Sequence, residues 1–351
     1  MKALVAGWFS FEGGHATAGD IITRDLVCEW LQAAGHQYDV AVAPPFTGGV
    51  DWRTADPRLY TDVLFVCGPF GPGDLEKEFV SRFEACRLIG MNLSMKVPLD
   101  EWNPFDLLIE RDSSGGANPD ISFLSRQPLV PVVGVCRVED YEGAPVAQAN
   151  SAIDRLIQSR QISIVEIDTR LDQNSTGLRT PAEVEALLAR MDVVITTRLH
   201  GTVLSLKNGV PVIPIDPEVR GWKVRRQAEL IGWPVIFNVD DCPDEALQRA
   251  LDFCLTEAAR IQARDCRERA IRLAVEVQRR FVTALTAGEA IEAAFRTRLS
   301  RAPRPVAGGE AGIPESDHAG TEARQPSAHR AKLAILLGRA KGWLKSVGRS
   351  K

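Results

Sequence analysis

A strand–turn–helix–strand pattern in the second half of this 351-residue chain constrains its fold most. The apolar run Val193–Ile195 predicts a short strand, and the segment Arg198–Gly201 then leads into the apolar positions of a short helix. Gly209 ends that helix, and Val210–Ile215 predicts a second buried strand. Apolar runs without alternation are typical of parallel strands that are covered on both faces. The pattern therefore places an arginine and a histidine where a strand ends and a helix begins.

This junction has the chemistry of an anion site. Open α/β sheets bind ligands at the carboxyl ends of their strands. The first turn of a helix offers N–H groups that have no partner within the helix, and a guanidinium adds charge and paired donors. We therefore predict that Arg198 and His200 contact an anionic ligand.

Similar strands and helices recur along the chain. In the first part we expect strands at 2–8, 38–43, 63–67, 88–93 and 107–109, with a helix from Asp20 to about Ala34. In the second part we expect strands at 130–136, 162–167 and 234–239 around the central unit, with helices from Asn150 or Ser151 to Arg160, after Thr180, and over 223–231.

This order predicts an α/β fold with two Rossmann-like domains and an interdomain cleft, a GT-B-like arrangement. We expect an N-terminal domain at 1–125 on the acceptor side. A second domain at 130–300 should contain the donor site and long terminal helices, with a break near Ala287-Gly288.

The last fifty residues differ in composition. Residues 301–328 are rich in Pro, Gly, Ser and Glu and are expected to be a disordered linker. Residues 329–351 contain seven basic residues and no acidic one, with leucines at helical spacing. This pattern predicts a basic amphipathic helix that contacts an anionic membrane. A solvated tail and a helix docked on its own domain remain alternatives.

Composition excludes several functional classes. The formal net charge is −4 and only three tyrosines are present, so we expect no nucleic-acid partner. The seven cysteines show no CxxC spacing, and we expect buried free thiols and no bound metal. Met1 leads directly into an apolar strand, so we expect no signal peptide, no membrane span and a cytoplasmic location.

Three segments resemble the polysaccharide pyruvyl transferase family. The run TTRLHGTVLSLKNGVPVIPIDP at 196–217 is similar to the family's Arg-Leu-His motif with its following helix and Gly-Val-Pro strand. VPVVGVCRVEDY at 130–141 resembles the strand that opens the second domain and ends in an arginine, here Arg137. GWFSFEGGHATAGD at 7–20 resembles the glycine-rich first turn, although its usual Gly-Asn-x-Gly-Asp form is altered here.

The resemblance implies a reaction and a donor site. The family transfers the pyruvyl group of phosphoenolpyruvate to two sugar hydroxyls, which forms a ketal and releases phosphate. It implies a cell-surface glycan such as an exopolysaccharide, or its lipid-linked precursor, as acceptor. Phosphoenolpyruvate is then a co-substrate, and no further cofactor is expected. The donor-binding residues implied are Arg137, Arg198, Leu199 and Gly201.

The chemistry of this reaction suggests further roles. Two guanidiniums at neighbouring strand ends can hold the phosphate and the carboxylate of the donor. An imidazole titrates in the range that the proton transfers need, so His200 is the first catalytic candidate and His15 is a candidate base on the acceptor side. Further candidate cleft residues are Gly13, Gly14, Asp20, Gly68, Asp168, Arg170 and Lys223.

Two other functions stay open at this point. A nucleotide-sugar-dependent GT-B glycosyltransferase would need a carboxylate, for which the segment Glu110–Asp112 is the candidate. A non-catalytic glycan-binding protein would give no reason for Arg137, Arg198 and His200 to converge. For the transferase, the basic segment 329–351 suggests peripheral binding at the inner membrane face.

Overall fold

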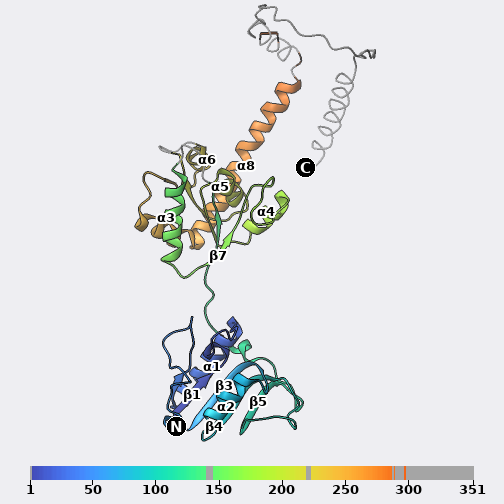
Figure 1. Ribbon diagram of the computed structural model, residues 1–351. Coiled ribbons are helices and arrows are strands. Elements are labelled where there is room, and N and C mark those ends of the chain that lie inside the picture. The colour runs from blue at the N-terminus through green and yellow to red at the C-terminus, as the bar shows by residue number, and fades with distance from the viewer. Residues whose placement is uncertain (1, 140–144, 219–222, 287, 289–295, 298–351) are drawn as a thin grey trace, which may run out of the picture. The chain divides into compact units, whose positions relative to one another are not determined.

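The computed structural model describes residues 2–139, 145–218, 223–286, 288 and 296–297 (Figure 1). The described residues form two five-stranded sheets in which all neighbouring strands are parallel. An α/β fold with two Rossmann-like halves is thus confirmed. The linker and the basic helix expected at 301–328 and 329–351 lie outside the described residues. The domain boundaries, the interdomain cleft and contact with a membrane stay predictions.

The first sheet has the strand order β2-β1-β3-β4-β5. Its strands are β1 (Lys2–Ala6), β2 (Gln37–Val40), β3 (Asp62–Phe70), β4 (Arg87–Met95) and β5 (Leu107–Asp112). The helices of this half are α1 (Ala18–Ala33) and α2 (Asp74–Arg82), with short 3₁₀ turns η1 (Trp8–Ser10), η2 (Pro57–Leu59) and η3 (Ile121–Leu124). Figure 1 shows this half in blue and blue-green.

The second sheet has the strand order β10-β9-β8-β6-β7. Its strands are β6 (Val132–Cys136), β7 (Ser163–Glu166), β8 (Val193–Thr196), β9 (Val212–Asp216) and β10 (Phe237–Asn238). Its helices are α3 (Val146–Gln158), α4 (Pro181–Leu188), α5 (Leu199–Lys207), α6 (Lys223–Ile231), α7 (Asp244–Cys254) and α8 (Glu257–Thr286). Numbered within its own half, each sheet has the same order, 2-1-3-4-5.

This shared order gives each sheet a topological switch point. The second strand lies beside the first toward one edge of the sheet. The third, fourth and fifth strands lie in turn on the other side of the first, toward the opposite edge. The switch lies between β1 and β3 in the first sheet and between β6 and β8 in the second. Ligands bind outside the carboxyl ends of the strands at such points, because the connections diverge and leave a crevice.

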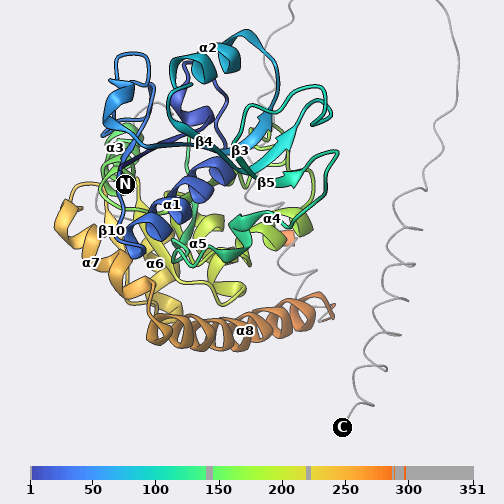
Figure 2. The same cartoon turned by 90° about the horizontal axis from the view of Figure 1, so that it is seen from below.

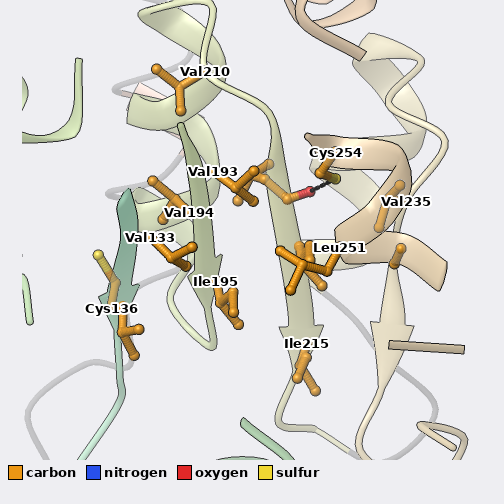
Figure 3. Close-up of a cluster of buried hydrophobic side chains, with 14 of the residues drawn as sticks. Val133, Cys136, Val193, Val194, Ile195, Val210, Ile215, Val235, Leu251 and Cys254 are labelled. Atoms are coloured by element: carbon orange, nitrogen blue, oxygen red, sulfur yellow. Dashed lines mark hydrogen bonds between the residues drawn. The ribbon is translucent and has the colours of Figure 1, made fainter. Parts of the chain in front are cut away.

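The two halves have different cores. The second core is mainly aliphatic and draws on the central strands and the helices around them; it includes Val133, Ile195, Leu251 and Cys254 (Figure 3). All four residues of β8 are buried, as the continuous apolar run predicted. The first half has two buried clusters: one is mainly aliphatic, and the other is rich in aromatic residues and includes Phe65, Phe70, Phe79, Phe83 and Trp52. Six of the seven cysteines are buried and Cys242 is partly buried, and all are free thiols.

Two expected helix starts are wrong, those of α1 and α3. Thr17 caps α1, and Asp20 lies one turn inside it, where its carboxylate accepts the Thr17 N–H at 2.7 Å and so completes a capping box. Helix α3 already begins at Val146, because the Ser151 hydroxyl donates to a carbonyl within the helix instead of capping it.

The long C-terminal helix has one break that the sequence analysis did not expect, whereas the break expected near Ala287-Gly288 falls at Ala287, which lies outside the described residues. The observed break separates α7 from α8 at Leu255 and Thr256, where the Thr256 hydroxyl accepts the Ala259 N–H. Helix α8 then continues to Thr286, and Figure 2 shows its length in brown and orange. Among the described residues, no helix combines the length and apolar character that crossing a bilayer requires.

Candidate functional site

The candidate site lies at the switch point of the second sheet, where β6 and β8 end side by side. Hydroxyl groups hold these two ends together. Thr196 donates its hydroxyl proton to the Cys136 carbonyl at 2.9 Å, and its oxygen accepts the Arg198 N–H at 2.9 Å. The Thr197 hydroxyl accepts the Val138 N–H at 2.8 Å. The two threonines that the sequence places after the strand therefore fix the backbone from which Arg198 projects.

The Arg198 side chain lies across the end of β6. Its Nε donates to the Arg137 carbonyl at 2.5 Å, and one terminal nitrogen lies 3.4 Å from Glu139 and 3.5 Å from Asp168. Only 14% of the side chain is exposed. Arg198 is thus held in one place by the main chain and by carboxylates on either side.

Arg137 lies close to Arg198, but its guanidinium has other partners. It pairs with Asp154 on α3 at 2.8 Å and lies 3.7 Å from Glu166 at the end of β7. Arg137 and Arg198 line one cavity of about 290 Å³, as expected of neighbouring strand ends. Three carboxylates line the same cavity, those of Glu139, Glu166 and Asp168. The two guanidiniums alone therefore do not make this cavity positive.

Asp168 supports the loop after β7. Its carboxylate accepts the backbone N–H groups of Arg170 at 2.9 Å and Ser175 at 3.0 Å. Burial by itself would raise the pKa of Asp168, but these N–H groups and the Arg198 guanidinium lower it below its ordinary value. The Arg170 side chain pairs with Glu139 and Asp172. Asp168 and Arg170 thus organise one wall of the site.

A second cavity, of about 220 Å³, lies on the other side of Arg198. Its lining residues are Val138, Thr169, Thr197, Arg198, Leu199, His200, Pro217 and Lys223. This set contains an arginine, a lysine and a histidine and no carboxylate. The Lys223 ammonium lies 3.8 Å from Glu218, which is not one of the lining residues. Among its described lining residues, the second cavity thus has cationic side chains and no carboxylate, and it includes both Arg198 and His200.

Helix α5 adds to this charge. It begins at Leu199 with Arg198 as its cap, and in the described part of the chain no side chain from that cap position bonds to its first turn. The N–H groups of a first turn have no partner within the helix, and they form its positive end. Gly201 is buried, and a Cβ there would lie 2.2 Å from the Thr196 hydroxyl oxygen. The glycine lets α5 approach β8 closely; its role in donor binding stays a prediction.

The acceptor-side candidates lie on the first sheet. His15, Gly14, Asp20 and Gly68 line a cavity of about 530 Å³ at the end of β1 and within β3, the switch point of that sheet. Gly13 is not among its lining residues. His15 is exposed and has a φ of +54°, so its side chain stands on a tight turn of the loop. The roles of these residues also stay predictions.

Sequence reasoning missed several lining residues. Thr169 and Thr197 line the second-sheet cavity, and Trp8, Cys67, Lys96 and Arg111 line the first-sheet cavity. A rule based on position would have found four of these six, because Thr169, Thr197, Trp8 and Lys96 each come within three residues after a strand end. Within the described ranges, no group of three or more His, Cys, Asp or Glu side chains is arranged to hold a metal ion.

Residues 138–218 match the family model described as polysaccharide pyruvyl transferase. This segment is therefore similar to a polysaccharide pyruvyl transferase domain. The match begins directly after Arg137 and includes Asp168, Arg198 and His200, whereas Lys223 lies beyond it. The matched segment thus includes the α5 junction, and the resemblance noted in the sequence is confirmed for that segment.

Solved structures with similar chains are much more distant. They include the calicheamicin glycosyltransferase CalG4 (12% identity, 78% of this chain and 97% of that chain, TM-score 0.28) and the glycosyltransferase SnogD from Streptomyces nogalater (17%, 78% and 99%, 0.27). A UDP-GlcNAc 2-epimerase from Methanocaldococcus jannaschii also matches (10%, 79% and 100%, 0.28). No curated protein matches the sequence. Similarity at this level supports no conclusion about the reaction.

Proposed function

We propose that this protein transfers the pyruvyl group of phosphoenolpyruvate to two hydroxyls of a glycan, which forms a cyclic ketal and releases inorganic phosphate. One observation carries the proposal: Arg198, His200 and Lys223 converge with the first turn of α5 on a cavity whose described lining residues include no carboxylate. This junction lies within the segment that matches the pyruvyl transferase model. A small, doubly charged enol phosphate fits such a cluster of cations and N–H donors.

In the proposed reaction, the α5 turn and Lys223 hold the phosphate while Arg198 holds the carboxylate. A proton adds to the methylene carbon, which becomes a methyl group and leaves positive charge at the carbon that carries the phosphate. One sugar hydroxyl adds there and loses its proton. Phosphate then leaves with the C–O bonding pair, and the second hydroxyl closes the ketal with loss of its own proton. His200 transfers protons in these steps, because an imidazole both gives and accepts protons near neutral pH.

A nucleotide-sugar glycosyltransferase is the main alternative, because a diphosphate also binds at a helix amino terminus. The carboxylates that it would use have other partners in this structure. Glu110 accepts the Ser113 hydroxyl at 3.1 Å, and Asp112 accepts the Ser94 hydroxyl at 2.7 Å. We therefore propose phosphoenolpyruvate as the donor in preference to a nucleotide sugar.

The test uses the full chain and three ligands: phosphoenolpyruvate, phospholactate and UDP-glucose. Phospholactate carries the same two anionic groups without the enol, so it should raise the melting temperature like phosphoenolpyruvate but release no phosphate. Phosphoenolpyruvate should release phosphate only when a glycan acceptor is added. Stabilisation by UDP-glucose together with no effect of either phosphate ester would refute the proposal.

A further inference from the structure

The cavity on the first sheet has features that the donor chemistry does not explain. It has a volume of about 530 Å³ and lies at the switch point between β1 and β3. This volume lies in the range of small-molecule sites, roughly 300 to 1,000 Å³. Twelve residues line it, from the β1 loop, the start of α1, the ends of β3 to β5 and Asp120.

Strands β3 and β4, which lie beside this cavity, each bend at a residue with a left-handed backbone, and the two residues occupy the same position in the register. Cys67 in β3 has a φ of +63°, and Asn92 in β4 has a φ of +60°. They lie between the register pairs Val66↔Met91 and Gly68↔Leu93. Left-handed backbone at non-glycine residues is strained and tends to occur where a site requires it. The Asn92 side chain holds the bend, since its amide oxygen accepts the Ile121 N–H at 3.3 Å.

Trp8 forms an aromatic wall of the cavity. Its indole N–H donates to the Pro69 carbonyl at 3.1 Å, and its ring packs edge-on against Phe65. A Cβ on Gly68 would lie 2.4 Å from the indole ring, so only glycine permits this position of the ring. An indole that is fixed in this way offers a flat apolar surface with a polar edge.

The charges of the cavity lining balance one another. The Lys96 ammonium lies 3.1 Å from Glu76 and 5.5 Å from the centre of the Trp8 ring, and Arg111 pairs with Asp120 at 2.9 Å. The Asp20 carboxylate accepts the N–H and the hydroxyl of Thr17. Because these charged side chains already have partners, the cavity favours a ligand with hydroxyl groups over a further ion. The Lys96 ammonium has three N–H donors and can still donate one to a hydroxyl of the ligand.

We propose that this cavity is a sugar subsite that binds an uncharged pyranose, with the C–H face of the sugar ring on Trp8 and its hydroxyls bonded to Asp20 and Lys96. Its assignment as the acceptor subsite rests on the proposed function, but sugar binding itself does not. The first sheet would then bind the neutral substrate, and the second sheet the anionic one.

The experiment measures saturation-transfer NMR on the full chain without phosphoenolpyruvate. The probes are the methyl glycosides of glucose, galactose, mannose, N-acetylglucosamine and N-acetylmannosamine, together with methyl glucuronide and methyl galacturonide. At least one neutral glycoside should bind, and more tightly than either uronide. Trp8→Ala should weaken binding about tenfold, the fold-change expected when a stacking aromatic group is lost. The control Trp30→Ala removes a tryptophan of α1 that does not line this cavity and should leave binding unchanged.

Asp20→Asn provides a second variant if Trp8→Ala does not fold. It retains an oxygen that can accept the Thr17 N–H but removes the charge, and it should also weaken binding, while Asp25→Asn on the same helix should not. Binding of no glycoside, tighter binding of uronides, or equal losses in target and control variants would overturn the inference. Stabilisation by phosphoenolpyruvate without sugar binding would refute this inference alone. Sugar binding without phosphate release would support the subsite and refute the proposed function.

Discussion

The two sheets share a strand order but differ at their switch points. At the second sheet, β6 and β8 end cleanly at Cys136 and Thr196, and cations gather at the start of a helix. At the first sheet, β3 and β4 bend and continue past Cys67 and Asn92 beside an aromatic wall, and charges pair with one another. The comparison teaches that topology fixes where a ligand binds, whereas the few residues after each strand decide its charge.

The largest expected effect comes from Arg198→Ala. It removes the guanidinium that lines both second-sheet cavities, and phosphate release from phosphoenolpyruvate should fall roughly 100-fold or more, in the range found when a preorganised donor is lost. A phosphate-release assay measures this. Lys207→Ala, at the other end of α5, is the control. Binding of methyl glycosides should persist in both variants; its loss in Arg198→Ala would break the comparison, since the two edges would then not be independent.

His200→Ala tests whether His200 transfers protons or only binds the donor. Loss of a proton-transfer group should lower kcat on the order of 100-fold with a smaller change in the KM for phosphoenolpyruvate. Steady-state kinetics over pH 5–9 separates the two parameters. A raised KM with an unchanged kcat would make His200 a binding residue only.

Gly201→Ala tests whether the close packing of α5 against β8 requires glycine at this position. The added methyl group would lie 2.2 Å from the Thr196 hydroxyl oxygen, so the free energy of unfolding should fall by about 2 kcal/mol. Gly19→Ala is the matched control within α1, since its Cβ would lie 3.6 Å from the nearest atom, an ordinary contact. Urea unfolding measures both. Equal stability of the two variants would contradict the close packing described here.

The last effect concerns the Asp168 carboxylate and depends on pH. Because its pKa is lowered in the folded state, its ionised form stabilises the fold above the unfolded pKa of about 3.9, and this contribution disappears as the pH falls through the folded value. Asp168→Asn should therefore lower the free energy of unfolding by about 2 kcal/mol at pH 7, and the difference from the unchanged protein should narrow below about pH 4. Asp252→Asn, which affects an exposed ion pair with Arg160, should show little pH-dependent difference.

Much of the fold could be predicted from the sequence. The apolar runs predicted the central strands, and the strand β8 followed by α5 lies where expected, because continuous burial and the Gly209 helix end are local signals. The helix ends were predicted less well. Asp20 and Thr17 both suit a cap, and only the closed capping box decides between them.

The site could be predicted only in part, because side-chain partners are not local. The sequence placed Arg137 and Arg198 at neighbouring strand ends, but not the pairing of Arg137 with Asp154, which lies a helix away. The convergence of Lys223 with His200 likewise depends on how α6 packs beside α5. The strand bends at Cys67 and Asn92 carry no sequence signal, since neither residue is a glycine.

The hydrogen bond between Arg198 and the carbonyl of Arg137 restricts which residues can replace Arg198, and it also affects ligand binding. One N–H of the guanidinium anchors the side chain to the backbone beside the adjacent strand, while a terminal nitrogen lies near Glu139 and Asp168 and the residue lines both cavities. A lysine has no planar fork and could not serve both purposes at once. The side chain is also immobilised before any ligand arrives, so little rotational freedom is lost when one binds. Exchange of Arg198 for lysine would keep the positive charge but lose the hydrogen bond that anchors the side chain to the Arg137 carbonyl.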